Sequence, residues 1–173
     1  MRYGIFDIIA AHYRTFSGST FCYVWDVIAL FLIPIFVGIG ASQHPSHDEV
    51  PLFNSAIAAY SIFAALLLSS QVGVYGIFQS DTRKISDLEA GSTEQKNLLK
   101  KRDLLEELNS NISYCVILSV FSVGYLLATI FVRLNPKWEI GVFWFISTHF
   151  FFSLLIVIRK THALFQGEYL NSK

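Results

Sequence analysis

Residues 81–111, DTRKISDLEAGSTEQKNLLKKRDLLEELNSN, decide the fold, because this polar segment lies between apolar runs too long for a soluble core. It holds 6 of the 13 Lys and Arg residues and 7 of the 13 Asp and Glu residues. Gly91 is a residue type that often ends helices, and Ser92 followed by Gln95 matches a capping box. The pattern predicts two helices that meet near Gly91.

The apolar positions of this region recur at helical spacing on both sides of the expected turn. They are Phe78, Ile85 and Leu88 before it, and Leu98, Leu105, Leu108 and Ile112 after it. Reversal at Gly91–Ser92 gives four facing pairs, Phe78 with Leu105, Ile85 with Leu98, Asp81 with Arg102 and Asp87 with Lys96. Two apolar pairs and two opposite-charge pairs from one turn predict a helical hairpin over 79–111.

The remaining chain is strongly apolar, with 53% hydrophobic residues and 16 Phe among 173 residues. Four runs approach or exceed the roughly 20 residues that cross a bilayer. They are 21–40, 52–78, 112–132 and 139–158. We therefore expect an all-α integral membrane protein with four transmembrane helices over 21–173, in which the hairpin extends spans two and three. Pro34 should kink the first span.

The first twenty residues have a different pattern. One helical face carries Ile5, Ile8, Ile9, His12 (or Tyr13) and Phe16, with Arg2, Asp7 and Arg14 nearby. This pattern is typical of an amphipathic helix that lies in the membrane interface.

The basic residues indicate the orientation of the spans. Placing both termini and the hairpin on one side collects 11 of the 13 Lys and Arg residues there. Because positive charge accumulates on the cytoplasmic side, we expect both termini and the hairpin in the cytoplasm.

Small residues line faces of the expected second and third spans. They are Ser61, Ala65, Ser69 and Gly73 in the second span, and Gly124 and Ala128 in the third. Small side chains let helices approach closely in lipid. Two interpretations remain open: the stripe packs the chain's own helices, or it forms a seam between copies. We expect spans two and three to form the inner layer and the aromatic-rich fourth span to face lipid.

Polar residues within or beside the spans are candidates for a pore or a gate. They are Asp26, Gln71, His149, Glu106 and Glu107. His149 suits either a proton relay or a neutral packing role, and Gln71 suits a hydrogen bond between helices. For Asp26 a structural role, paired with Arg14 or hydrogen-bonded to Ser17 or Ser19, is favoured over a functional one. In an oligomer, the two glutamates near the membrane would form a ring that attracts cations.

Metal and catalytic motifs are weak. His44, His47, Asp48 and Glu49 are metal-ligand types, but their loose spacing favours a solvated loop. Cys22 and Cys115 are far apart and suggest neither a disulfide framework nor a zinc site. We expect no cofactor and no enzymatic activity.

A basic cluster lies towards the tip of the expected hairpin, formed by Lys96, Lys100, Lys101 and Arg102. Its distance from the bilayer makes it poorly placed for lipid headgroups, whose field fades within a Debye length. It suits an anionic nucleotide, an oligonucleotide or an acidic protein surface. A solvated helix face with internal ion pairs is the other interpretation.

The chain resembles small four-span membrane effectors of bacterial anti-phage defence systems, such as the membrane subunits of Kiwa and Hailong. The amphipathic start Ile5 to Phe16, the hairpin between spans two and three, and the run from Leu104 to Tyr114 carry the resemblance. It implies a homo-oligomer, with a tetramer favoured, in the bacterial inner membrane. Such an assembly would be controlled by a cytoplasmic partner or a nucleotide signal.

Three functional hypotheses follow. The first is an oligomeric effector that forms or gates an ion-conducting or membrane-depolarising assembly. The second is a non-conducting anchor or sensor whose hairpin recruits a cytoplasmic defence protein. The third is a membrane immunity protein against a pore-forming toxin.

Overall fold

Every element in the described part of the chain is helical. The computed structural model describes residues 4–14, 28–43, 50–87, 92–132 and 135–171, with backbone alone at 84, 86, 87 and 167–171. The elements are α1 (Ile5–Arg14), the π-helical segment η1 (Ile28–Leu32), α3 (Ile33–Ser42), α4 (Val50–Asp87), α5 (Thr93–Val132) and α6 (Pro136–Asn171).

Three helices, α4, α5 and α6, are long and apolar enough to cross a membrane. The predicted class, an all-helical membrane protein, agrees with this arrangement. The predicted first span is represented by the shorter apolar stretch Ile28–Ser42, and residues 21–27 lie outside the described part. Four crossings are therefore not established by these helices.

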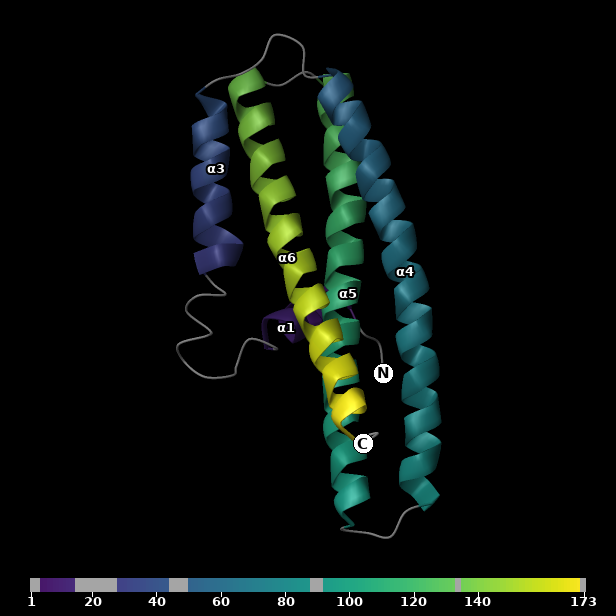
Figure 1. The fold of residues 1–173 in the computed structure, drawn as a ribbon. Helices are drawn as coiled ribbons and strands as arrows, with labels where there is room; N and C mark the ends of the chain where they lie inside the picture. Colours follow the sequence, from purple (N-terminus) through teal and green to yellow (C-terminus); the bar gives the residue numbers. More distant parts are fainter. Residues whose placement is uncertain (1–3, 15–27, 44–49, 88–91, 133–134, 172–173) are drawn as a thin grey trace.

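The three long helices and the shorter α3 lie side by side in the order α3, α6, α5 and α4, which differs from their order in the sequence (Figure 1). α6 packs between α3 and α5, whereas α4 packs on α5. α1 runs crosswise and contacts α5, so the amphipathic helix expected near the N-terminus is present within the predicted range. This order places α5 and α6 at the centre of the bundle.

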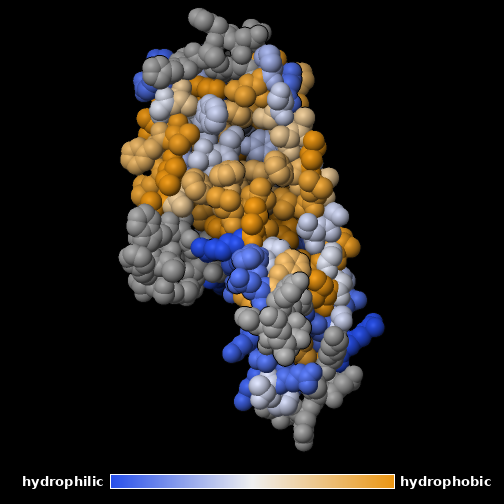
Figure 2. Space-filling view, viewed as in Figure 1, coloured by the Kyte–Doolittle hydropathy of each residue, from blue (hydrophilic) through white to orange (hydrophobic). Residues whose placement is uncertain are grey.

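The predicted hairpin consists of the ends of two continuous helices. α4 has 38 residues and α5 has 40. At about 1.5 Å per residue each is about 60 Å long, roughly twice the apolar thickness of a bilayer. Their extra length forms the hydrophilic end that protrudes below the apolar surface in Figure 2.

Ser92 caps the start of α5. The backbone N–H of Gln95 donates to Ser92 Oγ at 3.2 Å, and the N–H of Lys96 donates to the Ser92 carbonyl at 3.1 Å. These contacts match the first half of the predicted capping box. Gly91, the expected turn residue, lies outside the described residues.

The prediction that spans two and three form the inner layer and that the fourth span faces lipid is wrong. In the most apolar window of each helix, 44% of α6 is buried, against 28% of α5 and 17% of α4. Phe143 and Phe150 of α6 point inwards, where their rings contact Phe53 and Tyr60 of α4. Bulky aromatic side chains therefore fill the core, and α4 is the most exposed of the three long helices.

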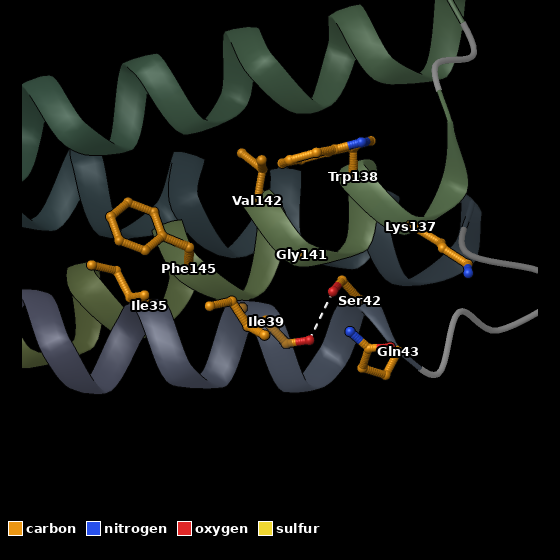
Figure 3. A pocket seen from close by; sticks show the side chains of 10 residues that line it. Ile35, Ile39, Ser42, Gln43, Lys137, Trp138, Gly141, Val142 and Phe145 are labelled. Atoms are coloured by element: carbon orange, nitrogen blue, oxygen red, sulfur yellow. Dashed lines mark hydrogen bonds between the residues drawn. The ribbon is translucent and has the colours of Figure 1, made fainter.

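α3 and α6 touch through Gly38 and Gly141, the second of which is labelled in Figure 3. A Cβ atom at Gly38 would lie 2.7 Å from the carbonyl oxygen of Gly141, closer than real Cβ contacts allow. The missing side chains let the two backbones meet directly.

α6 continues beyond the predicted end of the fourth span at residue 158 to Asn171. Leu164 is 6% exposed and belongs to the main apolar core. Lys160 forms an ion pair with Glu107 of α5. These contacts explain why α6 remains helical beyond the predicted end of the span.

Candidate functional site

A buried polar network joins four elements near the centre of the bundle. His149 of α6 lies at its middle: its Nδ1 atom is 2.6 Å from the carbonyl oxygen of Leu30, and its Nε2 atom is 2.7 Å from the hydroxyl of Tyr114. A carbonyl oxygen only accepts, so Nδ1 carries the hydrogen. In the neutral ring Nε2 then accepts from the Tyr114 hydroxyl. His149 was expected to act either as a proton relay or as a neutral packing residue, and this tautomer fits the neutral packing role.

The sequence of the first apolar helix explains why the Leu30 carbonyl is available. Pro34, four residues later, has no N–H to donate to it. The π-helical segment η1 ends at Leu32, directly before α3 and Pro34. This π-helical segment lies just before the proline at which the sequence predicts a kink, and His149 supplies the missing donor.

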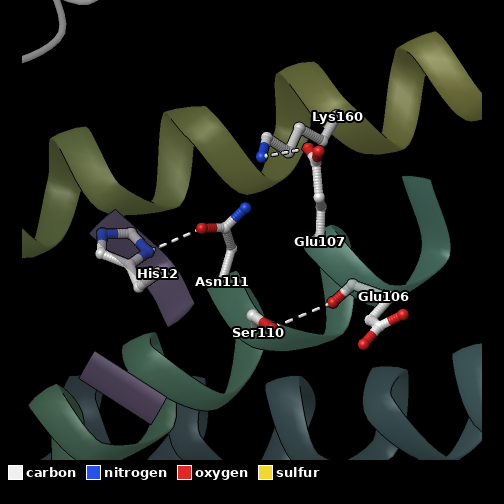
Figure 4. Close-up of polar contacts among 6 residues, drawn as sticks. All are labelled: His12, Glu106, Glu107, Ser110, Asn111 and Lys160. Carbon is white, nitrogen blue, oxygen red and sulfur yellow. Dashed lines mark hydrogen bonds and ion pairs between the residues drawn. The ribbon is translucent and has the colours of Figure 1, made fainter. Parts of the chain in front are cut away.

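α1 enters the same network through His12, which is fully buried. Its Nδ1 atom lies 2.6 Å from the side-chain oxygen of Asn111, and this contact is drawn in Figure 4. Its ring stacks on Tyr114 with centroids 3.9 Å apart and planes 6° apart. Burial, which disfavours the charged imidazolium, lowers the pKa of His12 from 6.5 to about 4.

Tyr114 links Tyr13 of α1 to His149 of α6 in one oriented line of hydrogen bonds. Its hydroxyl donates to His149, so it is left to accept from the hydroxyl of Tyr13 at 3.3 Å. Hydrogen bonds therefore run from Tyr13 to Tyr114, then to His149, and from His149 to the Leu30 carbonyl. This line fixes α1, α5, α6 and η1 relative to one another, and it can pass a proton only after its hydroxyls reorient.

From the sequence, His149 was a candidate site residue, and His12 (or Tyr13) was placed only on the apolar face of the first helix. The roles of Asn111 and Tyr114 were missed. His12 and Asn111 are 99 positions apart, and no local spacing links them. Their signal was limited to a histidine on an amphipathic helix and an asparagine where the charged helix becomes apolar.

Gln71 forms a hydrogen bond between helices, as its sequence position suggested. Its side-chain nitrogen donates to the hydroxyl of Ser113 at 2.9 Å, joining α4 to α5.

The two glutamates near the apolar boundary differ from each other. Glu107 accepts from Lys160 at 2.8 Å, beside the His12 contact (Figure 4). Glu106 has an exposed side chain, and its backbone carbonyl accepts from the hydroxyl of Ser110. Glu107 therefore ties α5 to α6 within one chain.

The hairpin brings its charges together in a register that differs by one residue from the predicted one. Asp81 pairs with Lys101 at 3.0 Å, so the predicted Asp81–Arg102 pair is wrong. The Arg102 guanidinium instead lies over the Phe78 ring, 4.9 Å from its centroid. Consecutive helical residues point about 100° apart, so only one of these two cations can face Asp81.

The other predicted hairpin pairs have mixed outcomes. Phe78 packs against the core cluster that contains Leu105. The Asp87 side chain lies outside the described part, so its pair with Lys96 stays a prediction. Lys96 and Lys100 are exposed.

A small pocket of about 220 Å³ lies between the hairpin arms, close to the apolar boundary. Tyr75 and Phe78 line it from α4, and Arg102, Glu106 and Asn109 line it from α5. It combines aromatic rings with a guanidinium, an amide and the Glu106 carboxylate.

The small-residue stripe lies on the surface. Ser61, Ala65, Ser69 and Gly73 of α4 are exposed, as are Gly124 and Ala128 of α5. A Cβ atom at Gly73 or Gly124 would meet nothing within 4 Å. These positions therefore do not serve close packing between the described helices of one chain.

Several sequence candidates fall outside the described residues. Asp26, Cys22, and the loop residues His44, His47, Asp48 and Glu49 belong to this group. Cys115 is a buried free thiol. Within the described ranges, no three His, Cys, Asp or Glu side chains gather as a metal-binding group.

No family model matches this chain, and neither a curated protein nor a solved structure matches it.

Proposed function

We propose that the chain is a four-span bacterial inner-membrane effector of anti-phage defence, with both termini in the cytoplasm. In this proposal it assembles into a homo-oligomer, with a tetramer favoured, and forms or gates an ion-conducting or membrane-depolarising assembly. The resemblance to the membrane subunits of Kiwa and Hailong supports this class. The observation that carries the proposal is the uncovered small-residue stripe of α4.

This stripe favours contact between copies. α4 is the least buried of the three long helices, with 17% of its apolar window buried. Four small residues one turn apart, from Ser61 to Gly73, leave a shallow track along it. In lipid such tracks promote close helix association, and several copies of a small bundle can together enclose a path that one copy cannot.

Helix α5 connects the hairpin to the membrane region. Its pocket contains Arg102, and the same helix, α5, carries Asn111 and Tyr114 two to three turns further on. These two residues contact His12 and His149. A nucleotide, an oligonucleotide or a protein that shifts the hairpin arms would therefore move the contacts that hold α1 and α6.

Membrane potential in expressing bacteria tests the proposal. Expression together with the cognate trigger should depolarise the cells, as read by a potential-sensitive dye. Gly73→Leu should weaken the effect, because its side chain would fill the track of α4. Gly40→Leu is the matched control, since a Cβ atom at this α3 glycine also meets nothing within 4 Å. Normal potential with the trigger present would overturn the proposal.

A non-conducting anchor or sensor is the second candidate, favoured by the exposed side chains of Lys96 and Lys100. Lys101 and Arg102 already have partners within the hairpin, so reversing them would also damage its structure. The double change Lys96→Glu and Lys100→Glu should abolish co-purification of a cytoplasmic partner without depolarisation. Unchanged co-purification would count against this candidate.

A further inference from the structure

A groove lies between α3 and α6, next to the contact of Gly38 with Gly141. Its volume is about 430 Å³, and its lining residues are drawn in Figure 3. Ile35 and Ile39 line it from α3, and Val142 and Phe145 line it from α6. In a bilayer an apolar groove of this kind faces hydrocarbon, so an acyl chain suits its lining.

One end of the groove is polar. Gln43 and Lys137 lie at this end, where α3 finishes and α6 begins. Lys137 is exposed, and no carboxylate of the described residues lies within ion-pair distance of it. Trp138, the next residue, is 73% exposed. A lysine and an exposed tryptophan at the end of an apolar helix are typical of the headgroup level of a membrane.

Charge and shape together identify the occupant. A cation at the polar end selects a phosphate, and the apolar lining below it selects a hydrocarbon chain. This end lies opposite the hairpin along the bundle (Figure 1), so the lipid belongs to the leaflet away from the hairpin. We propose that the α3–α6 groove binds an anionic glycerophospholipid, with its phosphate on Lys137 and one acyl chain between Ile39 and Phe145.

Native mass spectrometry of the detergent-purified full chain tests this proposal. Dioleoylphosphatidylglycerol should be retained in preference to dioleoylphosphatidylcholine. Lys137→Glu should reduce the retained phosphatidylglycerol about tenfold, because it removes the attraction and adds repulsion. Lys100→Glu, which reverses an exposed lysine of the hairpin, should leave retention unchanged. Equal loss in both variants would overturn the proposal, as would retention unaffected by Lys137→Glu.

A second variant tests the groove separately from the charge. Ile39 is 56% exposed, so Ile39→Trp can fill the groove without disturbing the core. It should reduce retention of both lipids. Unchanged retention in this variant would overturn the proposal, and so would the finding that Ile39→Trp separates a dimer while lipid stays bound, because the occupant would then be a second copy.

Discussion

The Nδ1 atom of His149 lies 2.6 Å from the carbonyl oxygen of Leu30, four residues before Pro34. Proline leaves that carbonyl without its helical donor, and a histidine 119 positions away in the sequence replaces it. An unsatisfied carbonyl in an apolar environment is costly, so the fold of η1 and α3 depends on α6.

A double-mutant cycle should detect this dependence. His149→Ala removes the donor and should lower thermal stability in detergent, by about 1–3 kcal/mol for a buried acceptor left unsatisfied. Pro34→Ala restores an N–H at the position that serves the Leu30 carbonyl. In the Pro34→Ala background, His149→Ala should therefore cost less. Additive effects of the two changes would contradict the dependence.

Docking of α1 should depend on pH through His12. Burial lowers the pKa of His12 to about 4; the hydrogen bond to Asn111 partly offsets this effect, and the positive charge of Lys160 reinforces it. Undocked His12 has its ordinary pKa of 6.5 and takes up a proton first. Docking is therefore strongest above about pH 6.5, weakens as pH falls towards 4 by about 3 kcal/mol, and then changes little.

Hydrogen exchange of the α1 amides, corrected for its intrinsic pH dependence, measures this change. Protection should be high at pH 7 and low at pH 4.5. His12→Phe keeps a ring against Tyr114 but has no titrating group, so its protection should vary little over this range. Equal protection of the natural chain at both values would refute the linkage.

The hairpin was predictable because its determinants are local. Spacing of Phe78 and Leu105 and the Ser92 cap fix two helices and their approximate register, whichever way the rest of the chain packs. The same argument could not decide between Lys101 and Arg102 as the partner of Asp81. That choice depends on the rotation of α5 about its axis, which contacts along the whole helix set.

The network and the layer order were not predictable for the opposite reason. His12, Asn111 and His149 come from distant segments, and their meeting follows from the placement of α6 between α3 and α5. Aromatic residues in the fourth span suit lipid or core equally well by composition. Phe143 and Phe150 are buried because α4 presents Phe53 and Tyr60 to them.

Gly38 and Gly40 of α3 offer a matched test of the α3–α6 contact. Gly38→Ala would place its Cβ atom 2.7 Å from a backbone oxygen, so the helices must separate. We expect a loss of about 1–3 kcal/mol, as in other overpacked sites. Gly40→Ala meets nothing within 4 Å and should be neutral or slightly stabilising, because alanine favours helix. Thermal unfolding in detergent compares them, and equal melting temperatures would exclude a tight crossing.

The Asp81–Lys101 pair should hold the hairpin arms together. Asp81 is 3% exposed, so Lys101→Ala would leave a buried carboxylate without this ion pair, whereas Lys100→Ala changes only an exposed neighbour. Breaking one side of a buried pair typically costs about 3–5 kcal/mol. Hydrogen exchange should therefore rise in both arms for Lys101→Ala but not for Lys100→Ala. The exchanged pair Asp81→Lys with Lys101→Asp should recover part of the protection, because it restores opposite charges at the same two positions. If Lys101→Ala left both arms as protected as Lys100→Ala does, apolar packing around Phe78 and Leu105 alone would hold the hairpin.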